Sequence, residues 1–111
     1  MSLSQLVDRA AAVSAVLAEL DVHRNEPVLI TLPEGPGFIE SFAGAVDHEA
    51  LPLPAGPLLS ASELAAAAAA ARARVVLASP DQLPTWAEVD TEPAILINGP
   101  HGPWIAALRL R

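Results

Sequence analysis

The sequence predicts an α/β fold, in which a small, mostly parallel sheet of about four strands is flanked by helices in a Rossmann-like arrangement of two or three layers. Short apolar runs typical of buried strands alternate along the chain with segments of helical periodicity. Capping patterns mark where helices begin, and turns rich in proline and glycine separate the elements. The 111 residues contain no internal repeat or flexible linker, so we expect residues 1–111 to form a single domain.

The first expected element is an amphipathic helix near the amino terminus. Ser2 and Gln5 have the spacing of a capping box, in which each side chain bonds the backbone of the other residue. Apolar residues then recur on one helical face: Leu3, Leu6, Val7, Ala10, Val13, Leu17 and Leu20. A polar segment ending at Pro27 stops this helix, and the apolar run at residues 28–32 predicts a buried strand.

A sharp turn of prolines and glycines at residues 33–37 leads into a second helix. Phe38 and Phe42 lie one helical turn apart in it, and we expect both in the core. Residues 51–53 predict a short second strand. Because the prolines next to its leucines cannot donate ladder hydrogen bonds, this strand is expected at an edge of the sheet or with only a few paired residues.

The third helix is marked by a second capping-box spacing, Ser60 with Glu63, ahead of an alanine run at residues 65–71. Alanine has the highest intrinsic helix propensity, which makes this helix the clearest element of the chain. Because alanine side chains fill little volume, we expect the helix to approach a neighbouring element closely.

Two further strands are expected at residues 75–78 and 94–97, since both are short apolar runs. Between them, Ser79 is followed by a proline, as is typical of a helix start, and Pro84 keeps that helix short. The tail at residues 104–111 fits either a strand or a helix.

Composition and charge restrict the classes of partner. Thirteen acidic residues against six arginines give a net charge of −7, which would repel nucleic acid and acidic membrane surfaces. The apolar runs are too short for a membrane span, and the first residues lack the pattern of a signal peptide, so we expect a cytoplasmic location. The absence of cysteine excludes a disulfide framework and thiolate chemistry.

No residue is predicted to be catalytic, cofactor-binding or metal-ligating, and no cofactor is expected. The turn at residues 35–37 has the position of an anion-binding loop, but Pro36 removes an amide donor and Glu34 adds negative charge. The serines that begin helices are interpreted as caps, and the paired acids of the connections as solvated groups. Metal-ligand spacing is absent among the histidines, His23, His48 and His101.

The segment at residues 28–79 reads VLITLPEGPGFIESFAGAVDHEALPLPAGPLLSASELAAAAAAARARVVLAS. In the order and spacing of its strands, turns and helices it resembles the N-terminal subdomain of the adenylate-forming (AMP-binding) superfamily. This superfamily comprises acyl-CoA synthetases, fatty-acyl-AMP ligases and nonribosomal adenylation domains. The resemblance begins at the first helix and ends near Ser79. Asp21 and Asn25 stand where the family has glycines in the connection to the first strand.

The resemblance implies a scaffold role for this region, with a link to fatty acid metabolism. In such enzymes ATP is held later in the chain by a Ser/Thr/Gly-rich loop ending in Pro-Lys-Gly, by an aromatic-plus-Thr-Glu motif and by an Asp that binds ribose. A lysine of the C-terminal domain supports acyl-adenylate formation. None of these motifs occurs in the 111 residues, and without any lysine the positive charge that stabilises the transferring phosphoryl group is missing.

The leading hypothesis is therefore a non-catalytic, stand-alone homologue of that subdomain, which acts through self-association or a protein partner. A homodimer is the simplest way to cover apolar surface that the rest of an enzyme would bury. The tryptophans, Trp86 and Trp104, fit either an interface or ordinary core packing. The interface candidates all lie in the tail: Trp104, Ile105, Leu108 and Leu110.

Three alternatives remain open. The chain fits a subunit of a split acyl-activating enzyme, whose ATP-binding motifs lie on another chain, with an adenylate-forming or carrier-protein partner. It also fits a small-molecule module that keeps a remnant acyl cleft. The last alternative is a fragment of a gene product with no independent role.

Overall fold

A computed structural model describes residues 2–56, 60–88, 94–98 and 104–109, with side chains described within residues 2–56 and 60–88. In these residues five strands form one sheet in the order β2-β1-β3-β4-β5. The strands are β1 (Pro27–Ile30), β2 (Leu51–Pro54), β3 (Val75–Ala78), β4 (Ala94–Asn98) and β5 (Trp104–Arg109). The first four are parallel, whereas β5 runs antiparallel to β4. The predicted α/β class with a mostly parallel sheet is confirmed, and the tail is a strand.

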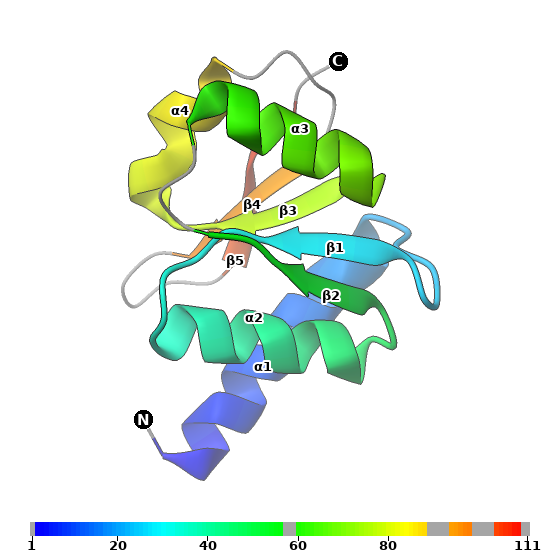
Figure 1. Ribbon diagram of the computed structural model, residues 1–111. Helices are drawn as coiled ribbons and strands as arrows, with labels where there is room; N and C mark the ends of the chain where they lie inside the picture. The colour runs from blue at the N-terminus through cyan, green and yellow to red at the C-terminus, as the bar shows by residue number, and fades with distance from the viewer. Residues whose placement is uncertain (1, 57–59, 89–93, 99–103, 110–111) are drawn as a thin grey trace.

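Helices cover both faces of the sheet, so the fold has three layers (Figure 1). On one face lie α1 (Leu3–Glu19) and α2 (Pro36–Asp47); on the other lie α3 (Ala61–Ala71), the 3₁₀ turn η1 (Pro80–Gln82) and α4 (Leu83–Ala87). The connection from β1 to β2 therefore passes over one face, and the connection from β2 to β3 returns over the other.

The capping box predicted for α1 is confirmed. The Ser2 hydroxyl accepts from the Gln5 N–H at 3.2 Å, and the Gln5 side chain accepts from the Ser2 N–H at 2.8 Å. The apolar face predicted for α1 is buried only in its later part, because the side chains of Leu3 and Val7 are exposed whereas Ala10, Val13 and Leu17 are buried. In Figure 1 this amino-terminal part of α1 extends beyond the sheet, so only the later turns reach the core.

The core beneath α1 and α2 joins the two helices to the central strands. Val13 and Leu17 of α1 and Ala45 of α2 are buried against one face of β1 and β3. At Gly44 the two helices touch, because a Cβ added there would overlap Val13 and lie 2.8 Å from the Ala10 carbonyl oxygen. Glycine at position 44 is thus required by the close approach of α1 and α2.

The core beneath α3 has a different composition. The buried residues of α3 are Leu64 and Ala68, so beyond Leu64 this helix offers little side-chain volume. Trp86 of α4, fully buried, packs in the same cluster and supplies the bulk that the alanines lack. The structure thus places Trp86 in the core, whereas the sequence left open whether it belongs to an interface or to the core.

Three helices end in the same unusual way, with a left-handed residue other than glycine. Asp21, Glu49 and Arg72 have φ values of 56°, 63° and 56°. After each of them the next N–H reaches back five residues, as in the bond from the Ala73 N–H to the Ala68 carbonyl at 3.1 Å. Asn25, with φ 65°, is left-handed as well. Asp21 and Asn25 therefore adopt a backbone conformation that glycine enters at less cost.

Candidate interaction surfaces

The edge of the sheet at β2 lacks outward-facing hydrogen-bond donors. The Leu51 N–H donates to the Glu26 carbonyl and the Ala55 N–H to the Ile30 carbonyl, both at 2.8 Å. Since backbone N–H groups alternate in direction along a strand, Pro52 and Pro54 occupy the outward-facing positions, and neither has an N–H. The predicted edge location is confirmed, and the prolines block the addition of another strand here.

The opposite edge of the sheet is β5. The structure places three of the four predicted interface residues, Trp104, Ile105 and Leu108, on this strand, whereas Leu110 lies outside the described residues. Trp104 pairs with Asn98 of β4, and a register shift separates the pairings of Ile95 and Leu96. In contrast to β2, the stretch WIAALR contains no proline. Its backbone can therefore accept a further strand on the side away from β4.

The third surface is the outer face of α2, which the sequence interpretation missed. Ile39, Phe42 and Val46 are spaced i, i+3 and i+7, so they share one side of the helix. Their exposed fractions are 51%, 39% and 53%. We refer to these three residues as the α2 stripe. The prediction that Phe42 belongs to the core is wrong, while Phe38 is partly buried against it.

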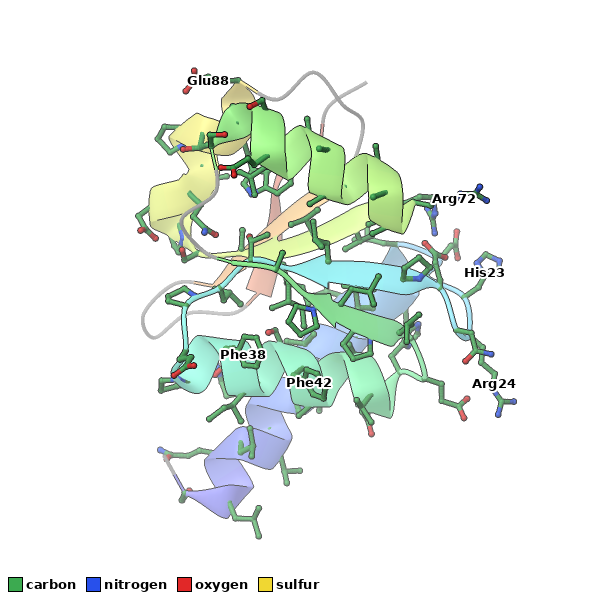
Figure 2. All side chains as sticks on the ribbon, viewed as in Figure 1. His23, Arg24, Phe38, Phe42, Arg72 and Glu88 are labelled. Carbon is green, nitrogen blue, oxygen red and sulfur yellow. The ribbon has the colours of Figure 1, made fainter. Side chains whose placement is uncertain are left out.

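The two phenylalanines lie together on α2 (Figure 2), with ring centroids 6.1 Å apart and planes inclined by 26°. Phe38 therefore joins the core to the base of the α2 stripe, and Phe42 continues the apolar surface outward. A sequence signal for this surface exists: between Glu34 and Asp47 the only charged residue is Glu40. An outer-layer helix ordinarily carries charged side chains towards solvent.

Glu40 faces inward, where it is paired. Its carboxylate lies 2.9 Å from the Arg9 Nη2 and accepts from the Arg9 Nε at 3.0 Å. The side chain of Glu40 is only 4% exposed, whereas that of Arg9 is 26% exposed. This ion pair joins α2 to α1 and leaves the outer face of α2 without charge.

The carboxyl ends of β1 and β3 are where open parallel sheets commonly bind ligands, because neighbouring connections leave towards opposite faces. Here β1 continues to α2 and β3 to η1 (Figure 1). The Gln82 amide bridges the two ends: its oxygen accepts from the Thr31 hydroxyl at 3.0 Å and the Ser79 N–H at 3.1 Å, and its nitrogen donates to the Thr31 carbonyl at 2.7 Å. The side chain of Gln82 thus forms hydrogen bonds with residues that follow β1 and β3, and these bonds link the ends of the two strands.

An electrostatic cluster lies at the amino ends of the strands. The Arg74 Nη2 donates to the Glu26 carboxylate at 2.9 Å and to the Asp21 carbonyl at 3.1 Å. The Arg74 Nε is also 2.9 Å from the second Glu26 oxygen. This contact is an ion pair whose geometry is not that of a hydrogen bond. Burial raises the pKa of Glu26, but the hydrogen bonds from Arg74 and His23 and the charge of Arg74 outweigh it, so that pKa is lowered.

The remaining candidate groups are dispersed. The His48 Nε2 lies 2.7 Å from the Val22 carbonyl, His23 is beside Glu26, and His101 lies outside the described residues. The described parts of the chain bring together no group of three or more side chains suited to a metal ion. Gly35, with φ 143°, precedes the first residue of α2. None of the helices in the described ranges has the length and apolar character needed to cross a membrane.

Comparison with known proteins gives one family and a group of related folds. A family model described as AMP-binding enzyme matches residues 1–102. No curated protein sequence matches the chain.

Solved structures of CoA ligases share this fold at low sequence identity. A benzoate CoA ligase from Burkholderia xenovorans LB400 superposes with a TM-score of 0.83 and 22% identity, over 93% of this chain and 22% of that chain. An acyl-CoA synthetase from Brucella canis superposes with a TM-score of 0.82 and 19% identity, over 99% of this chain and 20% of that chain. ATP-bound MatB from Rhodopseudomonas palustris superposes with a TM-score of 0.78 and 20% identity, over 94% of this chain and 21% of that chain. The chain thus spans about a fifth of the length of these structures.

Proposed function

Because the chain belongs to the AMP-binding enzyme family, we propose that its 111 residues act as a non-catalytic homologue of the N-terminal part of AMP-forming acyl-CoA ligases, working through self-association or a protein partner. The absence of lysine supports the non-catalytic part of the proposal, since acyl adenylation requires positioned positive charge near the transferring phosphoryl group. The six arginines include Arg9 and Arg74, which are engaged in structural ion pairs.

The observation that carries the self-association is the difference between the two edges of the sheet. Pro52 and Pro54 block strand addition at β2, whereas β5 has no proline and only β4 as its neighbour in the described sheet. Two copies can pair their β5 strands antiparallel about a two-fold axis, which would join the two sheets. Trp104, Ile105 and Leu108 then lie at the centre of the interface.

Light scattering coupled to size-exclusion chromatography tests this proposal at micromolar concentration. We expect the wild-type chain to elute with the mass of a dimer, and the variants Ile105→Lys and Leu108→Lys to elute as monomers, because lysine on an edge strand opposes pairing. Leu51→Lys, at the blocked edge, is the matched control and should remain dimeric. Circular dichroism establishes that each variant is folded. A monomeric wild-type chain would contradict self-association.

A second candidate function is that of a subunit of a split acyl-activating enzyme. It is favoured by coverage: nearly the whole chain superposes on structures about five times as long. In that case another chain supplies the ATP-binding motifs and the lysines. Affinity purification of the tagged chain from its native host should then retain an adenylate-forming or carrier protein. If no such protein is retained, the split-enzyme function is wrong.

A further inference from the structure

We propose that the α2 stripe is a docking surface for a polypeptide that presents apolar side chains between two basic groups. This proposal deepens the protein-contact role above and rests on it. It concerns a surface other than the β5 edge, and therefore a partner other than a second copy paired through β5.

The helix α2 buries its polar side chains and exposes apolar ones, since Glu40 and Ser41 are buried together with Gly44 and Ala45. Its inner side is buried against α1 and the sheet through Gly44 and Ala45. Its outer side carries the α2 stripe, whose members are between 39% and 53% exposed. An outer-layer helix ordinarily turns charged side chains towards solvent, so an exposed apolar side of this kind is suited to a partner.

The α2 stripe lies on a helix that is tightly packed against α1. Gly44 allows the backbone of α2 to lie directly against Val13, so α2 has no room to move closer to α1 or to rotate about its axis. The ion pair between Glu40 and Arg9 adds a polar contact between the same two helices. The α2 stripe is thus presented on a fixed support, and a partner loses little free energy in ordering it.

Two acidic residues stand at the two ends of α2 along the chain. Glu34 precedes α2 and Asp47 ends it, and both are exposed. Neither forms an ion pair with another residue in the part of the chain that the structure describes. The twelve residues of α2 span roughly 18 Å at 1.5 Å per residue, with one acidic residue two positions before the helix and the other at its last position. A complementary partner carries apolar side chains with a basic residue towards each end.

The same charges oppose a second copy of the chain as the occupant. If two α2 helices packed antiparallel, Glu34 of each would approach Asp47 of the other, and parallel packing would bring identical acids together. Either arrangement places like charges at both ends of the contact, between two chains that each carry a net charge of −7. An acidic lipid surface is opposed for the same reason.

The test uses the full chain and two synthetic helical peptides of 16 residues. Both peptides carry the same leucine stripe; one has arginines at its two ends and the other has glutamates. Fluorescence anisotropy of the labelled peptides measures binding at low and at high salt. We expect the arginine peptide to bind at least about tenfold more tightly than the glutamate peptide at low salt, and to lose most of that advantage at high salt.

Variants locate the contact. Phe42→Glu and Val46→Glu should each weaken binding of the arginine peptide by about tenfold or more, because a charge is placed within the apolar contact. Leu3→Glu makes the same kind of change at an apolar residue that is 77% exposed on α1, and should leave binding unchanged. Circular dichroism confirms that the variants are folded.

The proposal is overturned if the two peptides bind equally, if Phe42→Glu binds as well as the wild type, or if Leu3→Glu weakens binding to the same extent. It is also overturned if light scattering shows a dimer that Val46→Glu dissociates, because a second copy would then occupy the stripe. If the wild-type chain is monomeric but binds the arginine peptide through α2, self-association through β5 is wrong and the α2 docking surface stands. Failure of the proposed self-association and failure of the proposed docking on the α2 stripe are therefore distinguishable.

Discussion

Gly44 of α2 lies against Val13 of α1 so closely that no side chain fits between the two helices. A Cβ at position 44 would overlap the Val13 side chain and approach the Ala10 carbonyl oxygen to 2.8 Å. Both obstacles are close to the backbone of α1 and cannot swing away as the end of a flexible side chain would. The spacing of α1 and α2 is therefore set by a single hydrogen atom at position 44.

Gly44→Ala should lower the free energy of unfolding by about 1 to 3 kcal/mol, because the steric cost of overpacking exceeds the gain in helix propensity. Urea denaturation measures the change. Ala43→Gly, at a partly exposed position on the same helix, is the control and should cost less than about 1 kcal/mol. An unchanged or raised stability for Gly44→Ala would mean that α1 and α2 can separate without cost.

The ion pair of Glu26 and Arg74 predicts a dependence of stability on pH. The pKa of Glu26 is lowered from its ordinary value of 4.5 in the folded chain. Its contribution is therefore present above about pH 4.5 and is lost as pH falls through the lower pKa of the folded state. Glu26→Gln should destabilise the chain at pH 7 by about 1 kcal/mol or less, because Arg74 is half exposed.

The difference between the wild type and Glu26→Gln should shrink as the pH falls below 4.5, because the carboxylate of the wild type then becomes protonated. Thermal unfolding at several pH values measures it. Glu49→Gln, which alters an exposed carboxylate 3.6 Å from Arg24, is the control and should give a smaller effect. A difference that stays constant between pH 7 and pH 3 would show that Glu26 acts through packing and not through its charge.

The left-handed residue at the end of α3 predicts a stabilising substitution. Arg72 has φ 56° and is exposed, so replacing it by glycine relieves backbone strain and removes few contacts. Arg72→Gly should raise the free energy of unfolding by about 0.5 to 1 kcal/mol. Ala70→Gly, two residues earlier in the right-handed helix, should lower it by about 0.5 to 1 kcal/mol. If both variants were destabilised equally, the backbone at residue 72 would carry no strain.

The buried amide of Gln82 predicts an asymmetry between two substitutions. Gln82→Leu removes the partner of the Thr31 hydroxyl, the Thr31 carbonyl and the Ser79 N–H, and should cost about 2 kcal/mol or more. Thr31→Val removes one hydrogen bond and keeps the shape, and should cost about 1 kcal/mol. Chemical denaturation of both variants measures the costs. Equal costs would indicate that solvent reaches the Gln82 site.

The elements that the sequence predicted well depend on local chemistry. The two capping boxes at Ser2 and Ser60 fix the starts of α1 and α3 through bonds within four residues of chain. The edge position of β2 follows from proline, whose missing N–H is a property of the residue itself. Asp21 and Asn25, which stand where the family has glycines, both have a left-handed backbone, a conformation that the sequence analysis did not predict.

What the sequence did not reveal depends on contacts between distant segments. Helical periodicity placed Phe42 among apolar residues, but α2 has apolar residues on both sides, and periodicity alone cannot say which side meets the sheet. Trp86 is buried because the alanines of α3, far from it in the chain, leave space for its indole. The interface role of Trp104, Ile105, Leu108 and Leu110 stays a prediction.

Pro52 and Pro54 also limit how many copies can assemble through the sheet. If two chains join at β5, the combined sheet has β2 at both of its outer edges, and both of these edges lack the donors that a third chain would need. Growth by edge pairing therefore ends at two copies. In such a dimer the prolines would oppose the open-ended addition of strands that leads to fibres.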